Sequence, residues 1–78
     1  MLVEYEVDNG GHKFEFNTTW IVQYDCYIIE EAAEDYFNNH DGWENNWPIR
    51  IELFIESESI GIYSVELEST PIFSASKQ

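Results

Sequence analysis

Basic residues are scarce in this chain of 78 residues. Three of them, Lys13, Arg50 and Lys77, stand against sixteen Asp and Glu, so the formal net charge at pH 7 is −13. A field of that sign repels the phosphates of DNA and RNA and the surface of anionic membranes. We therefore expect no direct binding to nucleic acid or to a membrane, and a cationic partner is favoured.

Cysteine and long apolar runs are also lacking. Cys26 is the single cysteine, so no disulfide can form within the chain. The first residues, Met1 to Glu4, lack the basic start and apolar run of a signal peptide. No apolar run approaches the roughly 20 residues needed to cross a bilayer. The sequence therefore predicts a cytoplasmic protein.

Signatures of catalysis and metal binding are missing as well. Neither His12 nor His40 has a partner at metal-ligand spacing, and one cysteine cannot make a zinc motif. No nucleophile elbow or phosphate-binding glycine loop occurs. We predict no metal, no cofactor and no catalytic residue, so the protein is not expected to be an enzyme.

The chain does contain enough apolar side chain for one core. Hydrophobic residues make up 44% of it and aromatic residues 17%. Large rings bury the most area per residue, which helps a short chain to fold. Residues 1–78 are therefore predicted to form a single domain.

Two segments near the start show the period of a β-strand. Apolar residues alternate with acids over residues 2 to 8, and the alternation resumes over 13 to 17 after the turn sequence Asn9-Gly10-Gly11. This pattern predicts a β-hairpin. Residues 19 to 24 alternate too, and they are interpreted either as a strand continuation or as a connecting arm.

The period becomes helical between Cys26 and Asn39. Asp25 is placed to cap the start of this helix, and Gly42 is expected to supply the left-handed turn after its end. The residues predicted to face the core are Ile29, Ala32, Ala33, Tyr36 and Phe37.

Alternation returns over residues 49 to 56 and 63 to 68, which predicts a second hairpin turning near Ser57 to Gly61. Pro71 is expected to end it, and residues 74 to 78 to form a frayed tail. The predicted fold class is α+β, with the order ββαββ. One helix packs on one face of a mostly antiparallel sheet of about four strands, in the order 2-1-3-4. The other face should meet solvent or a partner.

Much of the acid alternates away from the predicted core and should share that open face. Like charges opposite one another on neighbouring strands are destabilising, so stability alone does not explain such a face. Lys13 and Arg50 are expected to lie within it. The predicted partner-binding residues on this face are Glu4, Glu6, Glu15, Glu52, Phe54, Glu56, Glu66 and Glu68, with Phe54 as an aromatic anchor.

The helix carries further acids on the side away from its apolar stripe. Glu30 with Glu34 and Glu31 with Asp35 are like-charge pairs four residues apart, each costing about 0.2 to 0.5 kcal/mol. They form either a solvated helix face or a second part of the partner-binding surface.

Two tryptophans lie in the segment of residues 43 to 48 that follows the helix. Each of them either anchors a partner or fixes the crossover to the core. We predict that Trp43 contacts a partner. Trp47 is the stronger candidate for packing against the core.

In size, charge and α+β pattern the chain resembles the small acidic inhibitors encoded by bacteriophages and mobile elements. These include DNA mimics directed at restriction enzymes, uracil-DNA glycosylase inhibitors and anti-CRISPR proteins. Glu58-Ser59-Ile60 looks like the Glu-Ser-Ile segment of uracil-DNA glycosylase inhibitors. The pattern over residues 33 to 48 is similar to one in uncharacterised small bacterial and phage proteins. The resemblance implies action inside a bacterial host cell, on a defence or repair protein.

Two functions stay open at this point. In the first, rows of carboxylates imitate nucleic-acid phosphates and block the groove of a cationic nucleic-acid-binding protein. In the second, the Trp43 to Trp47 loop or a sheet edge docks on a partner, and the charge serves solubility. In both, the chain acts as a monomer or a homodimer.

Overall fold

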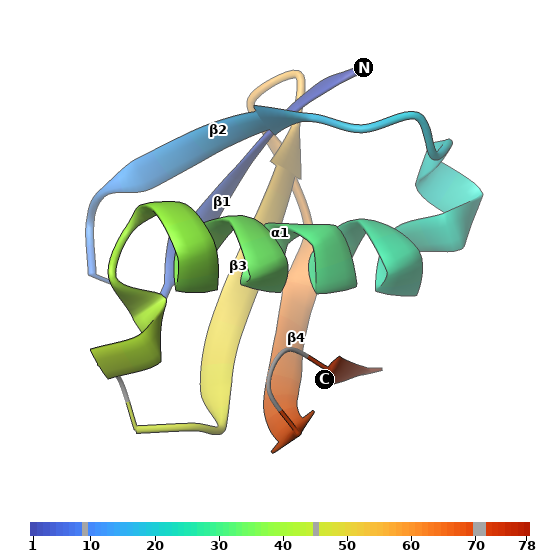
Figure 1. Cartoon of the computed structure of the whole chain (residues 1–78). Helices are drawn as coiled ribbons and strands as arrows, with labels where there is room; N and C mark the ends of the chain where they lie inside the picture. Colours follow the sequence, from blue (N-terminus) through green and yellow to red (C-terminus); the bar gives the residue numbers. More distant parts are fainter. Residues whose placement is uncertain (9, 45, 70–71) are drawn as a thin grey trace.

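The computed structural model describes residues 1–8, 10–44, 46–69 and 72–78 of the chain. The predicted roles of Asn9, Asn45 and Pro71 in turns and at a strand end lie outside the described residues. The described part folds into one antiparallel sheet of five strands with one α-helix packed against it (Figure 1). The α+β class is therefore confirmed.

The strands pair in the order β2-β1-β3-β4-β5, and every neighbouring pair is antiparallel. The predicted order 2-1-3-4 is confirmed, with a fifth strand added beside the fourth. The elements are β1 (Leu2–Val7), β2 (Lys13–Asn17), the 3₁₀ helix η1 (Val22–Tyr24), α1 (Asp25–Asn39), the 3₁₀ helix η2 (Gly42–Glu44), β3 (Ile49–Ile55), β4 (Glu58–Ser69) and β5 (Ile72–Lys77).

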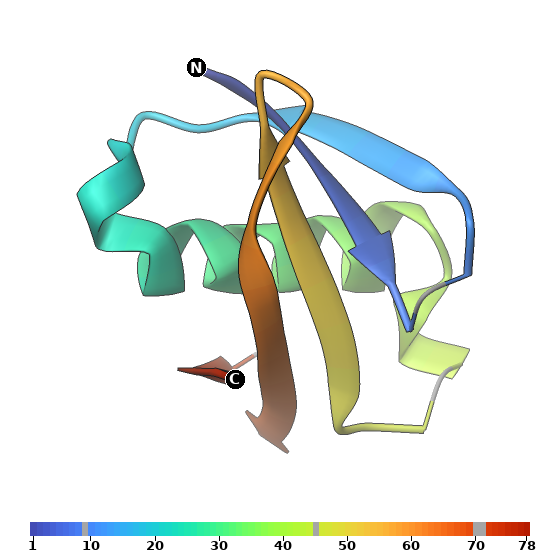
Figure 2. The same cartoon turned by 180° about the vertical axis from the view of Figure 1, so that it is seen from behind.

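The core lies between α1 and one face of the sheet, because the alternating strands turn every second side chain toward the helix. The helix presents Ile28, Ile29, Ala32 and Ala33 to it, and small alanines let the helix approach the sheet closely. The buried strand residues are Val3, Tyr5, Ile49, Ile51, Leu53, Tyr63, Val65 and Phe73. None of the helices in the described residues covers the opposite face of the sheet, as Figure 2 shows from behind.

Strand β5 corrects the prediction of a frayed tail over residues 74 to 78. Ala75 pairs with Val65 and Phe73 with Leu67. Phe73 is only 8% exposed and packs against Phe37, at 5.7 Å between ring centroids. The burial of this one ring, together with the β4 ladder, orders residues 74 to 77, whose side chains are small or polar.

Residues 19 to 24 form a connecting arm that ends in η1, so the strand alternative for them is wrong. Asp25 is the first residue of α1, and Tyr24 occupies the cap position without a capping side-chain hydrogen bond. The predicted capping role of Asp25 is therefore also wrong. Its Oδ1 instead accepts a hydrogen bond from the backbone N–H of Cys26, at 2.9 Å.

Two predicted turns differ in detail from the structure. The second hairpin turns at Glu56 and Ser57, which have φ of 53° and 67°, and Glu58 already begins β4. After α1, the left-handed residue is Asp41 with φ of 58°, rather than Gly42. Gly42 is needed because no side chain fits there. A Cβ atom would lie 2.6 Å from Tyr36 Cδ2 and 2.8 Å from the backbone N and Cα of Phe37.

Among the described residues, no helix has the length and apolar character required to span a membrane.

Candidate functional site: an acidic quartet on the open sheet face

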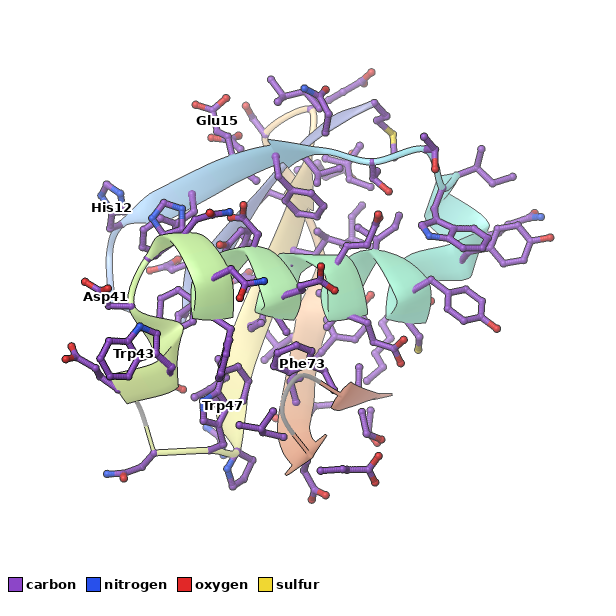
Figure 3. The ribbon with its side chains drawn as sticks, in the orientation of Figure 1. His12, Glu15, Asp41, Trp43, Trp47 and Phe73 are labelled. Carbon is purple, nitrogen blue, oxygen red and sulfur yellow. The ribbon has the colours of Figure 1, made fainter. Side chains whose placement is uncertain are left out.

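Four glutamates from three neighbouring strands meet on the open face of the sheet. Glu4 of β1 pairs with Glu15 of β2, and Glu6 of β1 pairs with Glu52 of β3. Figure 3 shows Glu15 projecting from β2 away from α1. We call Glu4, Glu6, Glu15 and Glu52 the acidic quartet.

Neutral donors hold two of these carboxylates in place. Glu6 Oε2 accepts a hydrogen bond from the backbone N–H of Gly11 at 2.6 Å, and Glu52 Oε2 accepts one from the Ser59 hydroxyl at 2.6 Å. In the described part of the chain, no Lys, Arg or His forms an ion pair with any quartet carboxylate. Glu6 and Glu52 are therefore held by neutral donors rather than by cations.

Lys13, the basic residue nearest the quartet in the strand register, lies over the same patch, because the Phe54 ring that it covers belongs to the residue facing Glu4. It faces Glu6 across the β1–β2 ladder, but its Nζ lies 4.0 Å from the centroid of the Phe54 ring. Phe54 is half-buried and covered by this ammonium group. A partner would therefore have to displace Lys13 before it could contact the predicted Phe54 anchor.

The other predicted open-face acids are dispersed. Glu66 faces Ser74 of β5, and Arg50 and Ser64 separate it from the quartet. Glu56 lies in the hairpin turn rather than on the face, because the strand ends at Ile55.

Glu68 lies at a register shift of β4, between Leu67 and Ser69, so strand alternation does not determine its face. Partial burial, and then the nearby carboxylate of Glu68, raise the pKa of Glu30 above its ordinary value. That Glu68 contacts a partner stays a prediction.

The acids of α1 divide into two groups. Glu34 is exposed, as predicted. Glu31 accepts a hydrogen bond from the Thr18 hydroxyl, and Asp35 Oδ2 accepts one from the Tyr5 hydroxyl at 2.6 Å. These two carboxylates connect the helix to Thr18 and to the sheet, so the alternative of a merely solvated face does not hold for them. That they contact a partner stays a prediction.

Asp25 repeats this arrangement at the other end of α1. Its Oδ2 accepts a hydrogen bond from the Tyr63 hydroxyl at 2.7 Å and lies 3.8 Å from Lys77 Nζ. Burial, followed by the neighbouring aspartate in each case, raises the pKa of Tyr5 and of Tyr63 well above the ordinary value of tyrosine. Both hydroxyls therefore remain protonated and serve as donors.

The two loop tryptophans have different environments (Figure 3). Trp47 packs against Phe37 and Phe73, and its indole N–H donates to the Gly42 carbonyl oxygen at 3.1 Å. The interpretation of Trp47 as a packing residue is confirmed. Trp43 is 59% exposed on η2 and stays available as a partner contact.

Two surface features were not indicated by the sequence pattern: a hollow beside the quartet and an aromatic cluster on the arm. The hollow, about 730 Å³, lies on the open face and is lined by Asp8, Arg50, Glu52, Ile62 and Ser64 among others. The aromatic cluster consists of Trp20, Tyr24 and Tyr27, all of them exposed. Neither interpretation of residues 19 to 24, as a strand or as a connecting arm, revealed this cluster, since Tyr27 lies beyond that segment on the helix.

Groups that could support chemistry are few in the described part of the chain. No three His, Cys, Asp or Glu side chains there form a metal-binding group. Burial, followed by the carboxylates of Asp25 and Glu30, raises the pKa of the Cys26 thiol, so it stays protonated and weakly nucleophilic.

Comparison of the chain with protein-family models, with curated proteins and with solved structures gave no significant match.

Proposed function

We propose that this chain is a non-catalytic acidic binding protein that occupies the nucleic-acid-binding groove of a cationic protein. The observation that carries the proposal is the acidic quartet. Neutral donors hold Glu6 and Glu52, and among the described residues no Lys, Arg or His forms an ion pair with any of the four carboxylates. Ordered charges cost little to organise on binding, so they favour association with Lys and Arg side chains of a partner.

The spacing of the quartet suits this role. Alternate residues on a strand lie about 7 Å apart, and two strand spacings are about 10 Å. Four carboxylates therefore occupy a patch of roughly 7 by 10 Å, while about 7 Å of duplex DNA carries about four phosphates. A groove that binds a nucleic-acid backbone would meet a similar linear density of negative charge here.

The destabilising arrangement of the quartet also favours a binding role. Glu4 faces Glu15 and Glu6 faces Glu52, although each like-charge pair opposes folding. A lysine in either pair would have stabilised the sheet. The chain resembles the small acidic phage inhibitors in this surplus of acid. A defence or repair protein of a bacterial host, met in the cytoplasm, is therefore the partner class that we propose.

Displacement of labelled DNA tests the proposal directly. A restriction endonuclease, a uracil-DNA glycosylase and a Cas9 effector are each loaded with fluorescent target DNA. Fluorescence anisotropy then follows DNA release as the chain is added. We expect stoichiometric release from at least one of them, with the effect falling as salt rises from about 50 to about 200 mM.

Matched charge variants separate the quartet from the overall field. The double variant Glu6→Gln with Glu52→Gln keeps the hydrogen-bond acceptors and should weaken displacement about tenfold or more. The double variant Glu34→Gln with Glu44→Gln removes the same charge from exposed positions outside the sheet, and should have a smaller effect. Equal losses in the two variants, or no displacement of DNA by the wild-type chain, would contradict the proposal.

A second candidate function is supported by the exposure of Trp43. In that case the chain is an interaction module that docks through η2, and the quartet serves only solubility. Trp43→Ala would then weaken partner binding more than the Glu6→Gln and Glu52→Gln double variant does.

A further inference from the structure

The arm before α1 displays a cluster of exposed aromatic rings. The indole of Trp20 stacks on the Tyr27 ring, with centroids 4.7 Å apart and planes inclined by 21°. Tyr24 contacts both rings, at 5.5 and 6.2 Å. The three side chains are 39%, 51% and 42% exposed, respectively for Trp20, Tyr27 and Tyr24, so a large apolar surface faces solvent here.

Hydrogen bonds fix the arm that carries these rings. The backbone N–H of Trp20 donates to the Thr18 hydroxyl oxygen at 3.1 Å, and the same hydroxyl donates to Glu31 of α1. The backbone N–H of Tyr24 donates to the Ile21 carbonyl at 2.9 Å. The aromatic surface is therefore preorganised, which lowers the entropic cost of binding.

A hollow of about 740 Å³ adjoins the cluster, between the arm and the β3–β4 turn. Its apolar wall includes Met1, Ile21, Ile55 and Ile60, beside the Trp20 ring, and its acidic residues are Glu56 and Glu58.

The chemistry of this surface selects one kind of occupant. Aromatic faces attract a guanidinium group through the ring quadrupole, and carboxylates bind the same group through paired hydrogen bonds. Nucleic acid would also stack on the rings, but Glu56 and Glu58 repel its phosphates. A second copy of the chain is disfavoured as the occupant, because each copy has a net charge of −13 and the two would repel each other.

We infer that the aromatic cluster and its hollow bind a peptide segment in which arginine neighbours a large aliphatic residue. The arginine stacks on the exposed rings and pairs with Glu56 or Glu58, while the aliphatic side chain enters the hollow. If the proposed function is correct, this segment belongs to the cationic protein whose groove the chain occupies. Recognition of the segment itself does not rest on the proposed function. The surface would then form a second contact, beyond the quartet, at the end of the sheet where the β3–β4 turn lies.

Indole N–H signals in NMR spectra test the inference with defined probes. The chain has three tryptophans, so Trp20 reports on the cluster while Trp43 and the packed Trp47 serve as internal controls. The probes are the blocked peptides Gly-Arg-Leu-Arg-Gly, Gly-Arg-Gly-Arg-Gly, Gly-Lys-Leu-Lys-Gly and Gly-Asp-Leu-Asp-Gly. We expect a saturable shift of the Trp20 signal, with the arginine–leucine peptide binding tightest and the aspartate peptide not binding.

Variants then assign the contacts. Tyr27→Ala should weaken binding of the arginine–leucine peptide about two- to fivefold, the range expected for one exposed cation–π contact. Trp43→Ala should leave the affinity unchanged. If Tyr27→Ala unfolds the chain, the comparison of the four peptides on wild-type protein still decides the question.

The inference would be overturned if the peptides shifted the indole signals of Trp20 and Trp43 equally, or if the arginine and aspartate peptides bound with equal affinity. A Trp20 signal that shifts with protein concentration alone would indicate self-association and would also overturn it. The Glu34→Gln and Glu44→Gln double variant, altered outside both surfaces, should shift the Trp20 signal with the peptides as the wild type does. If the chain binds the peptides but does not displace DNA, the proposed function is refuted and this inference stands. If the chain displaces DNA but does not bind the peptides, this inference is refuted and the proposed function stands.

Discussion

The hydroxyl of Tyr5 on β1 donates a hydrogen bond to Oδ2 of Asp35 on α1, at 2.6 Å. Tyr63 on β4 makes the equivalent bond to Asp25, ten residues earlier on the same helix. Two fully buried tyrosine rings thus cross the core and end on carboxylates near opposite ends of α1. The helix is therefore fixed to the sheet by directional polar contacts at both ends, in addition to apolar packing.

Replacing Tyr5 with phenylalanine should destabilise the fold by about 1.5 kcal/mol, because a hydrogen bond to a charged group is lost inside a partly buried site. Urea unfolding at neutral pH measures the change. Tyr24→Phe is the control, since the Tyr24 side chain is exposed, and it should alter stability by less than about 0.5 kcal/mol. Equal effects of the two substitutions would show that the Tyr5–Asp35 bond contributes nothing.

Alkaline pH should destabilise the chain through the same two tyrosines. Their raised pKa values mean that the folded state favours the neutral hydroxyl. Their contribution is therefore complete below the ordinary tyrosine pKa of about 10 and is lost as pH rises above it. With both sites active, the free energy of unfolding should fall by up to about 2.7 kcal/mol per pH unit.

Urea titrations between about pH 8 and pH 11 follow this loss, and the double variant Tyr5→Phe with Tyr63→Phe should reduce the slope. Ultraviolet absorbance provides a second measurement. Tyr5 and Tyr63 should ionise only as the chain unfolds. Ionisation of all five tyrosines near pH 10 in a chain that is still folded would contradict the expectation.

Gly42→Ala should cost about 1 to 3 kcal/mol, because the new methyl group would overlap Tyr36 and rigid helix backbone. Gly61→Ala is a matched control. A Cβ there would lie 2.7 Å from Lys77 Cε, at the far end of a flexible side chain that can move away. Thermal unfolding of both variants should show the larger loss for Gly42→Ala, and a larger loss for Gly61→Ala would be inconsistent with this packing.

The β3–β4 turn offers a stabilising substitution. Glu56 and Ser57 both have positive φ, which favours Asn-Gly in a two-residue hairpin turn. Glu56→Asn with Ser57→Gly should therefore raise the free energy of unfolding by about 1 kcal/mol. Glu56→Gln alone controls for the removed charge. A gain from Glu56→Gln as large as that from the double variant would assign the effect to electrostatics.

Neutralising the Glu6–Glu52 pair should stabilise the sheet by about 0.2 to 1 kcal/mol while it weakens partner binding. Glu34→Gln with Glu44→Gln removes equal charge away from this pair and should stabilise less. The gain should shrink at high salt, because ions screen exposed charges. A loss of stability in the Glu6→Gln and Glu52→Gln variant would mean that the two carboxylates support the fold.

The first four strands along the chain, their order and the helix were predictable because apolar periodicity determines them over long segments. Strand β5 was not, because among its described side chains Phe73 alone is large and apolar, and serines alternate with it. Residues 72 to 77 form a strand because they pair with β4, and the local sequence pattern does not reveal that pairing. The Asp41 turn was likewise hidden, since Gly42 is required for close packing and not for its φ.

The candidate site was predictable in part. Strand alternation correctly brought Glu4, Glu6, Glu15 and Glu52 to one face. It failed for Glu56, where a two-residue turn intervenes, and it does not determine the face of Glu68, which lies at the register shift between Leu67 and Ser69. Helical spacing alone also cannot distinguish a solvated carboxylate such as Glu34 from one that a buried tyrosine reaches.

The sheet stays open, with β2 and β5 at its two edges. The outer backbone amides and carbonyls of such edges are templates for pairing with another chain. Around neutral pH the mutual repulsion of highly charged molecules keeps these edges apart. Near the pI of about 4.1 that repulsion vanishes while the edges remain. Acid precipitation of this protein should therefore proceed by edge-to-edge growth of the sheet from one molecule to the next.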